Sequence, residues 1–305
     1  MVQARLLNAT ETASNPRHQH EALSLARRLP GLTAAAREVA ASVLHGVHGR
    51  RRAGAGETFW QFRPFTAGES AARIDWRRSA RDDRLYVRER EWEAAHNIWL
   101  WMDRSPSMAF VSDLALQSKL DRALVLGLAC ADLLVRGGER VGLLGLTRPR
   151  ASRDIVERLA QDLLLDDRRG ATPAELPPPA ALAPREQAVL VGDFLSPASE
   201  IAARLAALSA RGARCHVLMI ADPVEETFPF AGHTEFIDTD SGTRLRAGQA
   251  ENLRALYIAR LAAHREAIRT AARGGGGSFA VHRTDRPASA ALLALRAQLE
   301  APEAR

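Results

Sequence analysis

The sequence predicts an α/β protein with a three-layer, doubly wound, mainly parallel sheet, preceded by an N-terminal extension of helices and strands. From Asn97 onward, segments typical of strands alternate with segments typical of helices, the pattern of parallel strands joined by helical crossovers. The run from Ile98 to Met102 is entirely apolar, as expected for a strand covered on both faces of a sheet. A long amphipathic segment then begins at Lys119. These observations place the sheet in residues 96–300.

The N-terminal region, residues 17–95, is predicted to contain two helices and a β extension, after a disordered tail over residues 1–16. Pro30 and Gly31 should separate the two helices, because proline and glycine both interrupt helices. The predicted elements are helices at His20–Leu29 and Thr33–Leu44, strands at Thr58–Phe65 and Leu85–Trp92, and a short helix or helical turn that begins at Ile74-Asp75-Trp76.

The main domain is predicted to contain five sheet strands with helices between them. Gly137 and Gly138 mark the end of the first long helix, and Asp240-Ser241-Gly242 is typical of a hairpin turn. The predicted strands are Ile98–Met102, Val141–Leu146, Ala188–Val191, Cys215–Ala221 and Phe279–His282, with a hairpin of Glu235–Asp238 and Thr243–Arg246. The predicted helices are Lys119–Arg136, Ile155–Leu165, Ala198–Arg211, Gln249–Ala272 and Ser289–Leu299.

The composition limits the classes of function. With 46% hydrophobic residues in 305, the chain can bury a sizeable core. No apolar run approaches the roughly 18 residues of a membrane helix, and the N-terminus lacks a signal-peptide pattern, so we expect a cytoplasmic protein without a membrane span. The net charge of +6 is carried by arginines interspersed with acidic residues, and Lys119 is the only lysine, so nucleic acid is not the expected partner. Cys130 and Cys215 are expected to be buried thiols.

The polar residues that follow the first strand predict a metal site. Asp103 ends the strand, and Ser105 and Ser107 follow at two-residue spacing. In open α/β sheets, ligands bind in the crevice at the carboxyl ends of the strands. Aspartate and serine oxygens suit Mg²⁺ or Mn²⁺ better than zinc. The alternative is that these residues only form a turn and a helix cap.

Two motifs in this order resemble those of a bacterial family, the "domain of unknown function 58" proteins. The first motif is F-x-x-F-R-P-F-x-x-G-E, R-I-D-W-R-R-S-A-R and L-Y-V-R-E within residues 59–89, and the second is M-D-R-S-P-S-M at residues 102–108. The resemblance covers about residues 46–240. It implies a von Willebrand factor A-like (vWA-like) domain with a metal-ion-dependent adhesion site, and an association with MoxR-type AAA+ ATPases.

The resemblance also implies a set of metal ligands. Asp103, Ser105 and Ser107 match the first metal loop, Thr172 stands where the family's threonine loop is expected, and Asp193 matches the aspartate after a later strand. In such a site a vacant or water-filled position accepts an acidic residue of a partner, and outer carboxylates such as Asp193 hold the waters. The chain departs from the family in having Ala-Gly-Glu before R-I-D-W, and in a threonine loop compressed into a proline-rich segment.

The first hypothesis is therefore a non-enzymatic, metal-dependent protein-binding module that works with a MoxR-like ATPase or the client it remodels. Arg73, Asp75, Trp76 and Arg104 are the further candidates for contact with a partner.

Two other functions stay open. A Mg²⁺-dependent phosphoester hydrolase could use Asp193 or Asp75 as base, although no paired-carboxylate or histidine cluster accompanies the metal loop. Anion or nucleic-acid binding through Arg50–Arg52 and the Arg73–Arg84 cluster is the third option.

Overall fold

The computed structural model describes residues 16–47, 59–66, 69–81, 84–90, 95–169, 174–239 and 242–301. The chain divides into two compact units, a larger one of Met1–Gly46 with His96–Arg305 and a smaller one of Val47–Ala95. The predicted disordered tail lies outside the described residues except for Pro16, which begins a helix.

The larger unit is built on a five-stranded parallel sheet, so the predicted α/β class is confirmed. The strands are β3 (Asn97–Met102), β4 (Arg140–Leu143), β5 (Gln187–Gly192), β6 (Arg214–Ala221) and β9 (Ser278–Arg283). In the sheet order β4-β3-β5-β6-β9, β4 is added on one side of β3 and the later strands on the other side. The boundary between β3 and β5 is therefore the topological switch point, where ligands bind in such sheets.

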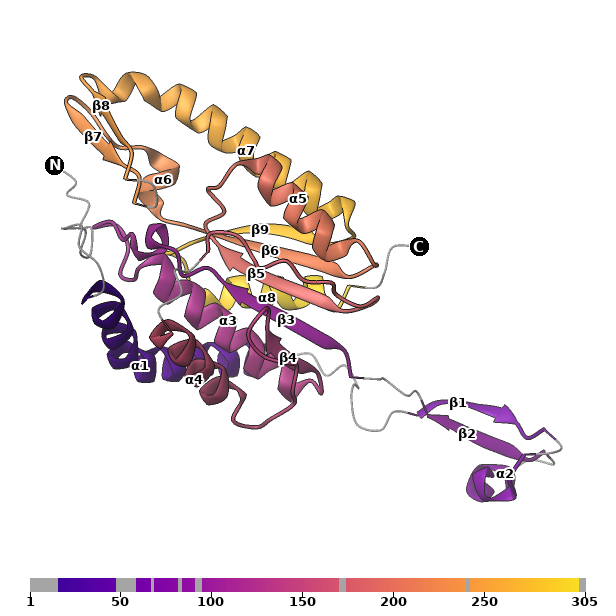
Figure 1. Ribbon diagram of the computed structural model, residues 1–305. Coiled ribbons are helices and arrows are strands. Elements are labelled where there is room, and N and C mark those ends of the chain that lie inside the picture. Colours follow the sequence, from indigo (N-terminus) through magenta and orange to yellow (C-terminus); the bar gives the residue numbers. More distant parts are fainter. Residues whose placement is uncertain are drawn as a thin grey trace. The chain divides into compact units, whose positions relative to one another are not determined.

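Helices cover both faces of this sheet (Figure 1). Side chains alternate along β3, so that Ile98 and Leu100 face one core while Trp101 faces the other. The first core is covered by α1 (Pro16–Val47), α3 (Lys119–Arg136), α4 (Ile155–Arg168) and α8 (Ala288–Leu299), and the second by α5 (Ala198–Ser209) and α7 (Arg254–Gly274).

Helix α3 has the predicted bounds because its ends carry strong local signals. The Ser118 side chain accepts a hydrogen bond from the backbone N–H of Asp121, and Gly137 ends the helix. Between these ends, the helix is buried from Ala123 to Leu134.

Helix α1 corrects the prediction of two helices separated at Pro30. The helix continues through Pro30, which is exposed. A proline inside a helix costs about 3 kcal/mol, but burying one large aliphatic side chain contributes about 1.5–3 kcal/mol. Apolar side chains on one face of α1, before and after Pro30, pack on the core, and their burial outweighs the cost of the proline. They are Leu25, Leu29, Leu32, Ala36, Ala40 and Val43. This packing also places α1 in the larger unit rather than with the β extension.

The connection from β4 to β5 differs from the prediction in a way that matters for the site. Strand β4 ends at Leu143, because the chain turns back and Arg150 pairs antiparallel with Val141. Helix α4 then runs on to Arg168, so its last turn, and not a loop, contains Asp166 and Asp167.

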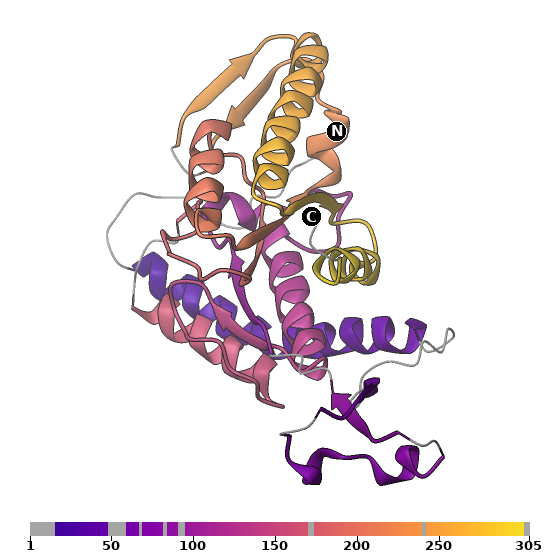
Figure 2. The same cartoon turned by 90° about the vertical axis from the view of Figure 1, so that its right-hand side faces the viewer.

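Between β6 and β9 the chain forms a short helix that was not predicted, α6 (Pro223–Thr227), and the predicted hairpin of β7 (Thr234–Ile237) and β8 (Arg244–Ala247). This hairpin lies beside the N-terminal half of α7 (Figure 2). Helix α7 begins later than predicted, after a 3₁₀ turn at Ala250–Leu253.

The smaller unit consists of an antiparallel pair, β1 (Phe59–Pro64) with β2 (Tyr86–Arg90), and the short helix α2 (Trp76–Ser79). Ile74 pairs with Val87, and both side chains are buried.

Neither cysteine forms a disulfide, and both are buried. Across the described residues, no helix combines the length and apolar character needed to cross a membrane.

Candidate metal centre

Asp103 lies at the switch point, directly after β3, and is completely buried. Its backbone N–H donates to the carbonyl of Val191 (2.8 Å), which holds it against the end of β5. Its Oδ1 accepts the backbone N–H of Ser105 (2.8 Å), but its Oδ2 is buried without a hydrogen-bond partner. A buried carboxylate oxygen without a partner is rare, because the lost solvation is costly.

Gly192 leaves the space that Asp103 needs. A Cβ atom at residue 192 would lie 2.7 Å from Asp103 Cβ and 3.1 Å from Asp103 Oδ2. Only glycine therefore fits beside this carboxylate without displacing it.

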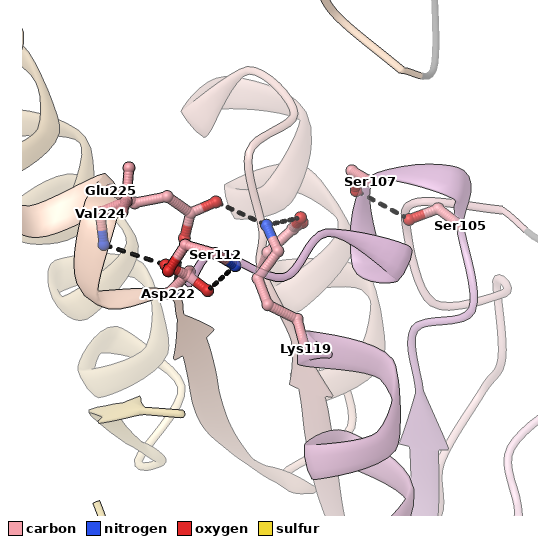
Figure 3. A network of polar contacts seen from close by, with 8 residues as sticks. Ser105, Ser107, Ser112, Lys119, Asp222, Val224 and Glu225 are labelled. Atoms are coloured by element: carbon pink, nitrogen blue, oxygen red, sulfur yellow. Dashed lines mark hydrogen bonds and ion pairs between the residues drawn. The ribbon is translucent and has the colours of Figure 1, made fainter. Parts of the chain in front are cut away.

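The two serine hydroxyls lie together next to Asp103. Ser105 Oγ and Ser107 Oγ are 3.1 Å apart (Figure 3). A 3₁₀ turn at Pro106–Ala109 holds this spacing, with Met108 buried beneath it. The structure thus brings Asp103, Ser105 and Ser107 together, and their role as metal ligands stays a prediction.

The environment of Asp103 disfavours its charge. Burial, and next the negative charge of Asp193, raise the pKa of Asp103 to about 7, although hydrogen bonds from Ser105 and the charge of Lys119 act in the opposite direction. A cation bound at Oδ2 would relieve this cost.

Asp193 follows β5 but is already engaged by a cation of the chain itself. Its Oδ2 accepts a hydrogen bond from Lys119 Nζ at 2.9 Å, and the same ammonium lies 2.6 Å from Glu225 Oε1. The Lys119 side chain is only 1% exposed. Glu225 attracts Lys119 most strongly and Asp193 next, and although burial works against the charged form, the pKa of Lys119 is raised above its usual value.

Asp222, at the end of β6, completes this network (Figure 3). Its Oδ2 accepts the backbone N–H of Ser112 (3.0 Å), while its Oδ1 accepts the Ser112 hydroxyl (2.5 Å) and the backbone N–H of Val224 (2.9 Å). Asp222 and Glu225 also form a capping box that begins α6.

The other predicted site residues of the larger unit have different placements. Thr172 lies outside the described residues. Arg104 forms ion pairs with Asp166 and Asp167, and its side chain is 12% exposed. Arg104 thereby ties the loop after β3 to the end of α4.

The remaining candidates lie in the smaller unit. Asp75 caps α2 by accepting the backbone N–H of Arg78 (2.9 Å), and Trp76 is 63% exposed. The backbone of Arg73 belongs to a 3₁₀ turn. Arg78 stacks on Tyr86, with its guanidinium carbon 4.7 Å from the ring centre. Arg50–Arg52 lie outside the described residues.

The donor set at Asp103 fits a hard divalent cation. It offers a partnerless carboxylate oxygen and two neighbouring hydroxyls, which are ligands that Mg²⁺ and Mn²⁺ prefer. Within the described part of the chain, no three His, Cys, Asp or Glu side chains cluster as metal ligands. The site would therefore depend on hydroxyls and water as well as on carboxylate.

Exposed leucines follow the carboxyl ends of the strands next to Asp103. Leu114 and Leu116 follow β3, Leu146 follows β4 and Leu195 follows β5. A cavity of about 170 Å³, lined in part by Trp101, Arg104 and Leu163, lies next to the loop that follows β3.

The sequence-based reasoning missed Lys119, Asp222 and Glu225. Two signals could have found them. Lys119 is the only lysine of the chain, and Asp222-Pro-Val-Glu225 has the spacing of a capping box after a strand.

The chain matches a protein family and resembles proteins of two mycobacteria. The model of a family described as "Protein of unknown function DUF58" matches residues 61–267. Proteins described as "Uncharacterized protein Mb1516" of Mycobacterium bovis and "Uncharacterized protein Rv1480" of Mycobacterium tuberculosis are 30% identical over 264 residues, which is 80% of this chain and 80% of theirs.

Two solved structures are more distant. An aerotolerance-related membrane protein from Bacteroides fragilis matches with a TM-score of 0.40 and 16% identity, over 67% of this chain and 98% of that chain. The conserved hypothetical protein BatB from Bacteroides thetaiotaomicron matches with a TM-score of 0.37 and 15% identity, over the same shares.

Proposed function

The chain belongs to the family described as Protein of unknown function DUF58, and from this premise we propose that it is a non-enzymatic, metal-dependent protein-binding module. The observation that carries the proposal is the buried, partnerless Oδ2 of Asp103 beside the Ser105 and Ser107 hydroxyls. Asp103, Ser105 and Ser107 would hold Mg²⁺ or Mn²⁺, with Thr172 as a further candidate ligand.

The bound ion would supply a positive charge that accepts a carboxylate oxygen. The chain's own residues prepare for this. Asp103 supplies a buried anionic oxygen, Gly192 keeps the space beside it free, and Asp193 is held near it by Lys119. An acidic residue of another protein is the natural ligand for such an ion.

The exposed leucines that follow β3 and β5 support a protein as the ligand. Leu114 and Leu116 follow the metal loop, and Leu195 follows Asp193 by two residues, so a protein that delivers a carboxylate would also cover leucines. Exposed apolar side chains gathered around one site are typical of protein contact surfaces. The family resemblance implies a MoxR-like AAA+ ATPase, or its client, as this partner.

Co-purification tests the proposal. The ATPase should bind the full chain in Mg²⁺, and this binding should be lost in EDTA and in Asp103→Ala. Asp154→Ala is the matched control, because that exposed carboxylate pairs with Arg158 at the start of α4, at the opposite end of the helix from the partners of Arg104. Equal capture in EDTA would contradict the proposal. Mg²⁺-dependent turnover of a phosphoester that is lost in Asp103→Ala would favour the hydrolase instead.

A further inference from the structure

Lys119 stands out from the rest of the chain. It is the single lysine among the 42 lysine and arginine residues of the chain, yet its side chain is among the most buried. It is also the first residue of α3, where a positive charge is unfavourable because the helix dipole is positive at that end. An ordinary surface cation would occupy neither position.

The contacts of Lys119 explain why a compact ammonium is present. Its Nζ lies between Asp193 Oδ2 (2.9 Å) and Glu225 Oε1 (2.6 Å), and 5.8 Å from the ring centre of Phe110. The planar fork of an arginine is larger and donates in fixed directions, whereas an ammonium can serve two carboxylates from a point.

The charges around the metal loop show what this contact changes. Asp103, Asp193, Asp222 and Glu225 are four carboxylates, and Lys119 provides one positive charge among them. With a divalent ion these five side chains and the ion sum to −1, whereas without the lysine charge they would sum to −2. The more negative site would repel an incoming carboxylate more strongly, and the repulsion is strong at a buried position.

We propose that Lys119 is a tethered cation that neutralises one carboxylate of this site, so that a divalent ion at Asp103 retains the charge needed to bind an acidic residue of a partner. The inference rests on the proposed function and assigns Lys119 as a positioning and specificity-determining residue. It has a distinctive consequence, because removing the lysine charge should strengthen metal binding and weaken carboxylate binding.

The test is a titration of the full chain with Mn²⁺, followed by the electron paramagnetic resonance of free Mn²⁺, with and without N-acetyl-glutamate as the carboxylate probe. In the wild type the probe should tighten Mn²⁺ binding. In Lys119→Met, Mn²⁺ should bind about tenfold more tightly, because a nearby positive charge is gone, and the effect of the probe should disappear. Lys119→Arg keeps the charge and should retain the effect of the probe.

A second variant, which removes a negative charge instead of a positive one, keeps the inference testable if Lys119→Met does not fold. Glu225→Gln removes a negative charge at a partly exposed position, so Mn²⁺ should bind about tenfold more weakly while the effect of the probe persists. A merely structural role would weaken metal binding in both variants. If Lys119→Met is not folded by circular dichroism, unchanged Mn²⁺ affinity in Glu225→Gln overturns the inference.

The results separate this inference from the proposed function. Equal Mn²⁺ affinities of the wild type and Asp103→Asn would show that the metal site itself is absent. Wild-type binding that depends on Asp103, combined with no response to changes at Lys119 and Glu225, would overturn the role of Lys119 alone.

Discussion

Asp222 and Asp103 both stand directly after a strand of the parallel sheet, and both are completely buried. Both oxygens of Asp222 accept hydrogen bonds, from Ser112 and Val224, whereas Oδ2 of Asp103 accepts none. The fold thus supplies partners for both carboxylate oxygens of Asp222 but for only one oxygen of Asp103. Buried polar groups are normally satisfied, so this difference supports the proposal that Asp103, and not Asp222, binds a cation.

The largest expected effect is at Asp222. Asp222→Ala should lower the free energy of unfolding by about 3–5 kcal/mol, because removal of a buried, fully bonded carboxylate leaves its donors unpaired. Denaturant unfolding measures it. Asp154→Ala removes an exposed aspartate and should have a far smaller effect. Similar losses in both variants would erase the contrast between Asp222 and ordinary surface positions.

At Asp103, removal of the charge should raise the free energy of unfolding of the metal-free protein instead of lowering it. Asp103→Asn should stabilise the metal-free protein at pH 8, by at most about 4 kcal/mol, since the pKa of Asp103 is raised from 3.8 to about 7. In the wild type, the folded state then binds this proton more tightly than the unfolded state. The Asp103 carboxyl group therefore does not lower the free energy of unfolding below roughly pH 4. Between about pH 4 and about pH 7 it lowers this free energy increasingly.

Unfolding measured at several pH values checks this expectation. The stability difference between wild type and Asp103→Asn should be near zero at low pH and should increase between about pH 4 and about pH 7. At pH 8, Mg²⁺ should stabilise only the wild type. A stability difference that is independent of pH would mean that the charge of Asp103 does not destabilise the folded state.

Gly192→Ala should produce a smaller loss of stability together with a loss of metal binding. The added Cβ would press on Asp103, and overpacking of this kind costs about 1–3 kcal/mol. Gly31→Ala is the control, because a Cβ there meets no atom within 4 Å and alanine favours the helix, so stability should rise by about 0.5–1 kcal/mol. Unimpaired Mg²⁺ binding in Gly192→Ala would show that Asp103 tolerates displacement.

The smallest expected effect is at Ser107. Ser107→Ala should change the stability of the metal-free protein by only about 0.5–1.5 kcal/mol, the usual contribution of one hydrogen bond. It should nevertheless reduce the stabilisation by Mg²⁺, measured as a thermal shift. Ser42→Ala on α1, which loses a single hydroxyl bond to Val39, is the control. Equal Mg²⁺ shifts in both variants would remove Ser107 from the ligand set.

Local signals explain which elements could be predicted from the sequence. The amphipathic segment that begins at Lys119 and ends at Gly137 predicted the bounds of α3, and the apolar run ending at Asp103 predicted the central strand. The spacing of Asp103, Ser105 and Ser107 was sufficient to bring them together, because a single short turn determines their geometry.

The failures come from contacts between distant parts of the chain. Pro30 is a strong local break, but the stripe that holds α1 to the core is a tertiary effect. The pairing of Lys119 with Asp193 and Glu225 joins residues 74 and 106 positions apart, which no local pattern encodes. Asp193 therefore has a partner that its place after a strand did not reveal.

The burial of Lys119 also has a practical consequence. Reagents that acylate amines find no accessible lysine side chain on this protein, because its one lysine is enclosed. Cross-linking through lysines would therefore miss the surfaces by which this chain touches another protein. Reagents directed at carboxylates or guanidinium groups, which are abundant along the chain, are the suitable probes.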